Sequence, residues 1–179
     1  MRRRNMQTVT APPDSAAAQR TGELRQFLDA HAVRLIGALT LITGSRAAAE
    51  DAVQEALVKA WHRRDTPIES LAAWITVVAT NTARSGWRRR QAEQRALDRA
   101  GARADVHSMA IDGEPFDQAL HDAVRTLPDR EREVVVLHYV LDQSVAQAAA
   151  AMGVTEGTVK TLLSRARQHP ADRLQPEGV

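Results

Sequence analysis

Apolar side chains return at three- and four-residue steps through most of this sequence, and no other feature restricts its fold as strongly. Ala, Leu and Val supply most of the 44% hydrophobic content, while aromatic residues make up only 3%. Strands favour β-branched and aromatic residues, whereas small aliphatic side chains pack well between helices. The one β-like run, Val134 to Leu137, lies inside a helical pattern. The sequence therefore predicts an all-α protein.

Three helices are expected in the first half of the chain. The first carries an apolar stripe from Leu24 to Ile42 and stops at Gly44, a residue that commonly ends helices. Ser45 can cap the second helix, which runs to about His62 with an unbroken apolar stripe. The third opens at Ser70 and runs into a block of arginines. The apolar stripe of the second helix is Ala49, Ala52, Val53, Ala56, Leu57, Ala60 and Trp61.

A seam divides the chain between Ala96 and Pro115, where the periodicity fades and glycines accumulate. Beyond this seam come several short helical segments, one of them beginning after Pro128. We therefore expect two small helical domains joined by a flexible linker. The expected bounds are a tail at 1–19, a domain at 20–95, the linker at 96–115, a second domain at 116–174 and a tail at 175–179.

The residue content excludes several classes of protein. There is no cysteine, which removes disulfides and thiol chemistry, and no apolar run approaches the roughly 20 residues that a membrane span needs. The six histidines are scattered without metal-ligand spacing, and no phosphate-binding loop or nucleophile elbow is present. We expect a cytoplasmic protein that is not an enzyme and has no metal, cofactor or membrane partner.

Charge is distributed unevenly along the chain. Seven arginines against two acids lie between Arg84 and Arg103, and eight acids against three arginines lie between Asp105 and Glu133. A basic block of this kind indicates either a polyanionic partner or an ordinary solvated helix face. The charge pattern alone does not separate the two.

The clearest motif is a helix-turn-helix over residues 145–164. Ala149 is small where two helices cross, and Gly153, four positions later, suits the left-handed turn between them. Thr155 can cap the second helix, whose inward face is expected to include Val159 and Leu162. Its outward face carries hydrogen-bond donors and no carboxylate after Glu156, a pattern that suits the major groove of DNA. That face consists of Gly157, Lys160, Thr161, Ser164, Arg165 and Gln168.

Three stretches, in order along the chain, resemble the extracytoplasmic-function (ECF) sigma factors of bacterial RNA polymerase. Gly157-Thr-Val-Lys-Thr-Leu-Leu-Ser-Arg-Ala-Arg167 resembles the recognition helix of that family, and Leu127-Pro-Asp-Arg-Glu-Arg-Glu-Val134 resembles the stretch before it. Ala49-Glu-Asp-Ala-Val-Gln-Glu-Ala-Leu-Val-Lys-Ala-Trp61 is similar to the helix of sigma region two that binds the polymerase. Together the three cover roughly residues 22–170.

The resemblance implies a role for each of three surfaces. The polar face Glu50, Asp51, Gln54 and Glu55 docks on core RNA polymerase, at the clamp helices of its largest subunit. The second domain reads the minus-35 promoter element and contacts the flap of the second-largest subunit. Its DNA-binding residues are Lys160, Thr161, Ser164, Arg165 and Arg167.

The same resemblance places promoter opening on the arginine block. Recognition and melting of the minus-10 element fall to Asn81, Arg84, Trp87, Arg88 and Arg89, with the loop Arg63 to Ser70 forming part of a base pocket. Trp74 corresponds to this segment as well, although its helical spacing favours a place in the core. Members of the family are often held inactive by an anti-sigma factor, which is a further candidate partner.

The chain departs from the family pattern at several positions, and two other functions compete with this interpretation. Ser85 replaces a usual Asp and is followed by Gly86, which weakens helices, and Pro170 is expected to end the last helix near Gln168. One alternative is a helix-turn-helix regulator that binds duplex DNA without polymerase. The other is a decoy that binds polymerase but opens no promoter.

Overall fold

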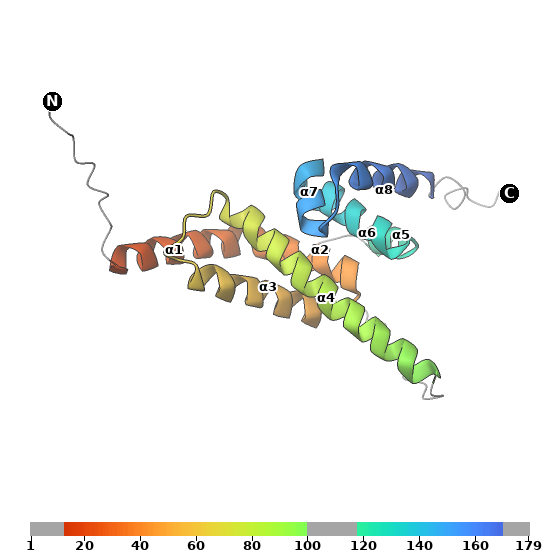
Figure 1. The fold of residues 1–179 in the computed structure, drawn as a ribbon, viewed down its shortest axis with the longest axis horizontal. Coiled ribbons are helices and arrows are strands. Elements are labelled where there is room, and N and C mark those ends of the chain that lie inside the picture. The colour runs from red at the N-terminus through yellow and green to blue at the C-terminus, as the bar shows by residue number, and fades with distance from the viewer. Residues whose placement is uncertain (1–12, 100–117, 170–179) are drawn as a thin grey trace, which may run out of the picture.

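The structure, a computed structural model, describes residues 13–99 and 118–169, and every regular element in these two ranges is a helix (Figure 1). This confirms the predicted all-α class. None of the helices in these ranges is both long enough and apolar enough to span a membrane.

The chain begins with a long, nearly continuous helical rod. Helix α1 (Pro13–Phe27) passes through one π-helical turn, η1 (Leu28–Ala32), into α2 (Val33–Thr43). The rod ends at Gly44, whose φ of 69° is left-handed and whose N–H donates to the Thr40 carbonyl at 2.8 Å. The predicted helix stop is therefore confirmed.

Helix α1 starts earlier than the sequence pattern indicates, so residues 13–19 belong to it and not to a tail. The physical reason is local propensity, since Pro13 suits a first helical position and the following alanines favour helix even without an apolar stripe.

Helices α3 (Arg46–His62) and α4 (Leu71–Arg99) pack against each other and against α2. Ser45 caps α3 as predicted, because its Oγ accepts the N–H of Ala48 at 3.3 Å. The small residues of the predicted stripe, from Ala49 to Ala60, are buried. Trp61 was expected in that stripe, but it is 36% exposed and lies under the Arg64 guanidinium, 5.5 Å from its ring centroid.

Helix α4 is the longest element and runs without interruption through Ser85 and Gly86. It continues to Arg99, so residues 96–99 are helical although the sequence pattern assigned them to the linker. Ala96, Leu97 and Arg99 have high helix propensity, which favours helix even where the apolar periodicity has stopped. The remainder of the expected linker lies outside the described residues.

The second half of the described chain is a compact group of short helices. These are α5 (Gln118–Arg125), α6 (Asp129–Val135), the π-helical turn η2 (Val136–Val140), α7 (Val145–Met152) and α8 (Glu156–Gln168). Val134, Leu137, Met152, Val159 and Leu163 form its apolar core. Helix α8 ends at Gln168, as Pro170 predicted.

The two helical domains pack against each other, which the sequence pattern did not indicate. Val124, Val136 and Val140 from the second domain are buried in the same apolar cluster as Leu35 and Leu39 of the first. In Figure 1 the group α5 to α8 lies against one side of the α1 to α4 bundle, with α7 in contact with α4. The functional surfaces therefore have to be considered in a closed arrangement of the domains.

Candidate nucleic-acid interface

The helix-turn-helix is held by local hydrogen bonds at both ends of its turn. Ser144 and Gln147 form a capping box at the start of α7, with N–H to side-chain distances of 3.2 Å and 2.8 Å. Gly153 adopts φ 64° and ψ 42°, which permits the sharp turn after α7. Thr155 then caps α8 by accepting the N–H of Thr158 at 3.2 Å. The sequence predicted both the glycine turn and the Thr155 cap.

Helix α8 presents one face to the core and the opposite face to solvent. Val159, Leu163 and Ala166 are buried. The predicted minus-35 residues Lys160, Thr161, Ser164, Arg165 and Arg167 are all exposed. The Thr161 hydroxyl donates to the Gly157 carbonyl at 2.9 Å, and Arg167 Nε donates to the Leu163 carbonyl at 3.1 Å. The structure thus brings all five together on the accessible side of one helix.

An open cleft of about 1110 Å³ lies between α3 and α4, and it contains part of the predicted minus-10 site. Asn81 and Arg89 line it together with Ser85 and Gly86. Trp74 also lines the cleft, with the Arg63 guanidinium 5.6 Å from its ring centroid. The full lining is Glu55, Lys59, His62, Arg63, Trp74, Val78, Asn81, Thr82, Ser85, Gly86 and Arg89.

Sequence reasoning missed part of this cleft. Lys59 and His62 come from the end of α3 and were not predicted as site residues, because only their contact with α4 makes them neighbours of Asn81. Glu55, predicted to dock polymerase, lines the same cleft.

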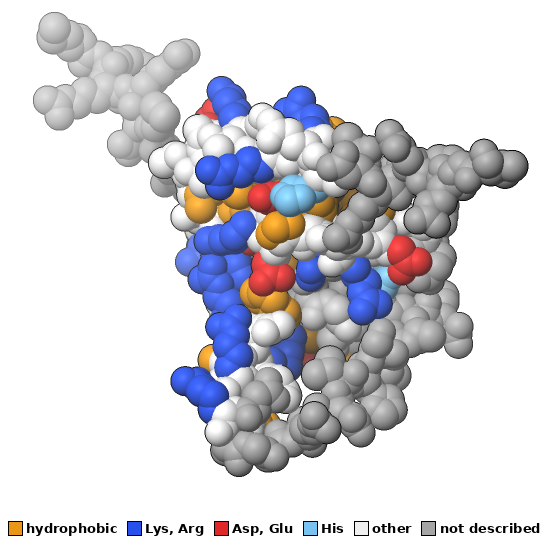
Figure 2. All heavy atoms as spheres, turned by 90° about the vertical axis from the view of Figure 1, so that its right-hand side faces the viewer, with side chains coloured by type: hydrophobic (Ala, Val, Ile, Leu, Met, Phe, Trp, Pro, Cys, Tyr) orange, Lys and Arg blue, Asp and Glu red, His pale blue; other side chains and the backbone are white. Residues whose placement is uncertain are grey.

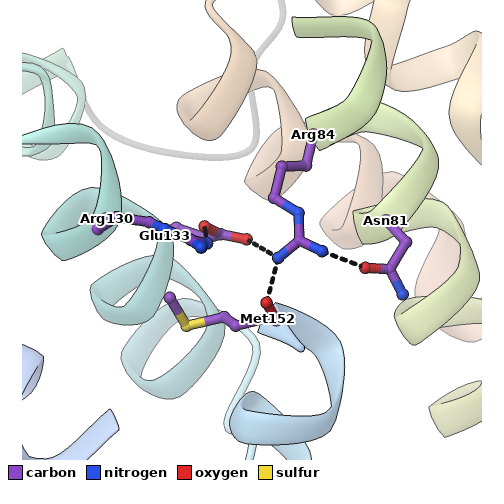
Figure 3. A network of polar contacts seen from close by, with 5 residues as sticks. All are labelled: Asn81, Arg84, Arg130, Glu133 and Met152. Atoms are coloured by element: carbon purple, nitrogen blue, oxygen red, sulfur yellow. Dashed lines mark hydrogen bonds and ion pairs between the residues drawn. The ribbon is translucent and has the colours of Figure 1, made fainter. Parts of the chain in front are cut away.

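Arg84 lies apart from this cleft, in the contact between the two domains (Figure 3). Its Nη2 donates to Asn81 Oδ1 at 2.7 Å, while Nη1 donates to the Met152 carbonyl and lies 3.5 Å from Glu133 Oε1. Glu133 also accepts from Arg130 at 2.9 Å. Burial lowers the pKa of the Arg84 guanidinium, and the Glu133 carboxylate opposes that shift.

The remaining arginines of the predicted minus-10 segment are on the surface. Arg88 and Arg89 are exposed and Trp87 is half-buried. Arg89 forms a loose ion pair with Glu93 at 3.7 Å, with both side chains well solvated. Figure 2, which views the end of the molecule toward which α4 projects, shows Lys and Arg side chains gathered in a column. This surface carries the positive charge that phosphates attract.

The predicted docking face of α3 is accessible. Asp51, Gln54 and Glu55 are exposed, and Glu50 is partly so. Glu50 pairs with Arg46 at 2.8 Å and Glu55 pairs with Lys59, both one helical turn away. Exposed pairs of this kind contribute little stability, so the carboxylates can exchange partners at small cost.

Across residues 13–99 and 118–169, no group of three or more His, Cys, Asp or Glu side chains is arranged to hold a metal ion. The described residues form two basic or donor-rich surfaces, on α4 and α8, and one acidic surface on α3.

Both halves of the chain are similar to parts of known sigma factors. The sigma-70 region 2 family matches residues 27–93, and the sigma-70 region 4 family matches residues 117–169. The chain is 31% identical to the ECF RNA polymerase sigma factor SigL of Mycobacterium tuberculosis, over 92% of this chain and 96% of that protein.

Two solved structures are similar in both sequence and fold. The sigma factor RpoE of Bartonella quintana, in complex with the anti-sigma factor NepR, has a TM-score of 0.65 and 28% identity, covering 81% of this chain and 92% of that one. CnrH, in complex with the cytosolic domain of CnrY, has a TM-score of 0.57 and 26% identity, covering 86% and 91%.

Proposed function

The chain belongs to the ECF RNA polymerase sigma factors, and on that premise we propose how its surfaces divide the work of promoter recognition. A sigma factor binds core RNA polymerase and directs transcription initiation at specific promoters. The proposal concerns which residues of this chain perform each part.

The minus-35 element is assigned to the exposed stripe of α8, and this stripe is the observation that carries the proposal. Lys160 and Arg165 can reach guanine edges or phosphates in the major groove, while Thr161 and Ser164 can contact either base edges or phosphates. The buried face of α8 fixes the direction of the stripe, because Val159 and Leu163 are packed in the domain core. Duplex DNA can therefore be read with little rearrangement of this helix.

The minus-10 element is assigned to the α3–α4 cleft and the neighbouring arginines. Arg88 and Arg89 provide phosphate contacts, and Trp87 is half-exposed beside them. The cleft next to Asn81 has room for a base turned out of the stack, with Trp74 offering an aromatic surface. Binding an unstacked base favours the melted promoter over the duplex.

Core polymerase is assigned to the acidic face of α3. Glu50, Asp51, Gln54 and Glu55 face away from the buried alanines of the same helix, so their use in binding does not disturb the core. We place the docking site for this face on the clamp helices, and a second contact between the C-terminal domain and the flap.

Three further assignments follow from the same proposal. The protein acts as an initiation factor and not as an enzyme, and it works in the cytoplasm, where the polymerase is. An anti-sigma factor is proposed as a third partner, since the similar RpoE structure contains the anti-sigma factor NepR.

Run-off transcription with purified core polymerase across a promoter library tests the proposal. We expect transcripts only when the chain is added, with a shared minus-35 and minus-10 sequence among the active promoters. Asp51→Ala should reduce capture of core polymerase, because it removes an exposed charge from the docking face. Asp29→Ala, which removes an exposed charge from η1, should leave capture unchanged.

Two outcomes would contradict the proposal. Tight, specific binding of the free chain to duplex promoter DNA, with no effect of polymerase, would indicate an ordinary helix-turn-helix regulator. Capture of polymerase without any transcript from the library would indicate a decoy.

A further inference from the structure

The contact between the two domains contains residues that the proposed function assigns to DNA. Val77 of α4 packs against the apolar core of the second domain, and Val136 and Val140 are buried in the core of the first. Asn81 and Arg84 lie on the same helix as Val77, one to two turns further along. The minus-10 helix is thus partly covered by the helix-turn-helix domain.

Arg84 is the polar centre of this contact (Figure 3). One terminal nitrogen donates to the last carbonyl of α7, at Met152, and faces the Glu133 carboxylate, while the other donates to Asn81. The Arg84 side chain is 16% exposed and that of Glu133 is 4% exposed. A guanidinium also suits the C-terminal end of α7. There the last carbonyls of a helix lack partners within the helix, and the helix dipole places a partial negative charge.

The acceptors around Arg84 resemble those of a nucleic-acid backbone. A guanidinium binds phosphate and carboxylate through the same planar set of N–H donors. In this arrangement the Glu133 carboxylate and the Met152 carbonyl hold Nη1, and Asn81 Oδ1 holds Nη2. Arg84 cannot offer Nη1 to DNA until the two domains separate, because Glu133 and Met152 belong to the second domain. Asn81 is bound by Arg84 of its own helix and lines the open cleft between α3 and α4.

A second polar contact joins the domains at the surface. Arg34 of α2 donates to Asp142 at 2.6 Å, just before α7. Both side chains are more than half exposed, so water and salt compete with this pair and it contributes weakly. Asp142 has a φ of 52°, the one positive φ of a non-glycine residue in the described chain. The interface therefore combines one buried polar contact with a weaker outer one.

We propose that Arg84 is a latch: in the free chain it ties the helix-turn-helix domain to α4 beside Asn81, and single-stranded minus-10 DNA displaces Glu133 from it. This inference rests on the proposed assignment of Asn81 and Arg84 to the minus-10 element. The same guanidinium serves the closed state and the DNA-bound state, so the two states exclude each other. Only the open fraction of the free chain binds the minus-10 strand, and the apparent affinity falls by that fraction.

The latch is tested by variants that weaken the contact without altering the proposed DNA-binding residues. Glu133→Gln removes the carboxylate that faces Arg84 and keeps the side-chain shape. Asp129→Asn is its control, because it removes one negative charge from the same helix but breaks only an ion pair to Arg132 within the domain. Arg34→Glu turns the outer pair into a repulsion. Arg25→Glu, on exposed α1 surface, makes the same change of charge away from the interface.

Opening can be measured without DNA or polymerase. The chain has no cysteine, so Val58→Cys on α3 and Ala150→Cys on α7, both exposed, allow two dyes to report the distance between the domains. The same proteins are then titrated with a single-stranded minus-10 oligonucleotide taken from an active promoter. We expect Glu133→Gln to lower energy transfer and to raise oligonucleotide affinity about tenfold. Arg34→Glu should act in the same direction by about twofold, relative to Arg25→Glu.

Unchanged energy transfer in both variants would overturn the latch, as would lower energy transfer with no gain in oligonucleotide affinity relative to the matched controls. If Glu133→Gln no longer melts cooperatively, the test rests on Arg34→Glu. The Arg34 side chain is exposed, so its substitution should leave the fold intact. Run-off transcription by the wild-type holoenzyme distinguishes the two proposals. If the transcripts are present and the variants behave as their controls, the latch fails while the proposed function stands.

Discussion

We propose that helices α8 and α4 both bind promoter DNA, yet their proposed DNA-binding side chains differ in accessibility. The stripe of α8 from Lys160 to Arg165 is exposed, and its direction is set by side chains buried within its own domain. On α4, Arg84 is bound to the other domain, while Arg88 and Arg89 are exposed one turn later. The proposed minus-35 surface on α8 is therefore fully accessible in the free chain. On α4, Arg84 is held by the second domain, whereas Arg88 and Arg89 are free to contact DNA.

The difference in accessibility matches the two kinds of DNA that we propose the helices bind. Helix α8 would bind a stable duplex, and α4 would bind a melted strand. Duplex DNA is always available, so a preformed surface is useful as soon as the polymerase delivers it to a promoter. An accessible single-strand site would bind unrelated nucleic acid, because phosphate and stacking contacts tolerate most sequences. Under the proposed latch, holding Arg84 in the contact between the domains restricts that binding in the free chain.

Among single substitutions, the largest effect is expected at Arg165. Arg165→Ala should cost about 1–3 kcal/mol on promoters with the preferred minus-35 element, if the guanidinium reads a base edge. Holoenzyme binding to promoters varied at each minus-35 position measures this. Arg125→Ala removes the same charge from α5 of the same domain and should not change the sequence preference. Equal weakening on every promoter would reduce Arg165 to a phosphate contact.

A second prediction concerns the turn that directs α8. Gly153→Ala should lower the free energy of unfolding by about 1–2 kcal/mol, because φ is 64° and a Cβ strains a left-handed residue. Gly157→Ala is the control, since it lies in the first turn of α8 with only ordinary contacts around an added Cβ. Denaturant unfolding should show loss for the first and no loss for the second. Equal stability of the two variants would show that this turn does not restrict the helix.

A third prediction tests whether the start of α7 is fixed locally. Ser144→Ala removes one half of the capping box and should cost about 1 kcal/mol of stability. Ser164→Ala, a serine on the exposed stripe of α8, should be close to neutral in the same thermal melts. A cost at Ser164 as large as that at Ser144 would contradict the division between supporting and reading residues.

The smallest effect is expected at the exposed arginines of α4. Arg89→Ala should weaken single-strand binding by the holoenzyme uniformly across sequences, and should lower the slope of log affinity against log salt by about 0.7. The exposed Arg99 lies at the far end of α4, and Arg99→Ala serves as its control. A change in base preference, with the salt slope intact, would instead place Arg89 on a base.

The contrast between the helices also explains what the sequence could predict. The helix stop at Gly44, the turn at Gly153 and the cap at Thr155 depend on residues within a few positions, and the structure confirms each of them. The exposed stripe of α8 is equally local, because helical periodicity alone decides which side chains share a face.

Tertiary contacts decided what the sequence could not predict. Arg84 meets Glu133 and Met152 across 49 and 68 residues, and no local pattern indicates such a partner. Val136 and Val140 have the same periodicity whichever domain core they enter. Trp61 continues an apolar stripe, but it is 36% exposed and its ring lies against the Arg64 guanidinium. The roles of the acidic face, of the minus-10 residues and of the α8 stripe stay predictions.

Residue-specific arginine modification, followed by mass spectrometry of the free chain, directly tests whether Arg84 is held while the other proposed DNA-binding arginines are exposed. An exposed guanidinium reacts quickly with a dicarbonyl reagent, whereas one held by a carboxylate and a carbonyl reacts slowly. We expect fast modification of Arg88, Arg89 and Arg165, and slow modification of Arg84. In Glu133→Gln, Arg84 should react as fast as the exposed arginines. Modification of Arg84 in the wild-type chain at the same rate as Arg88 and Arg165 would contradict it.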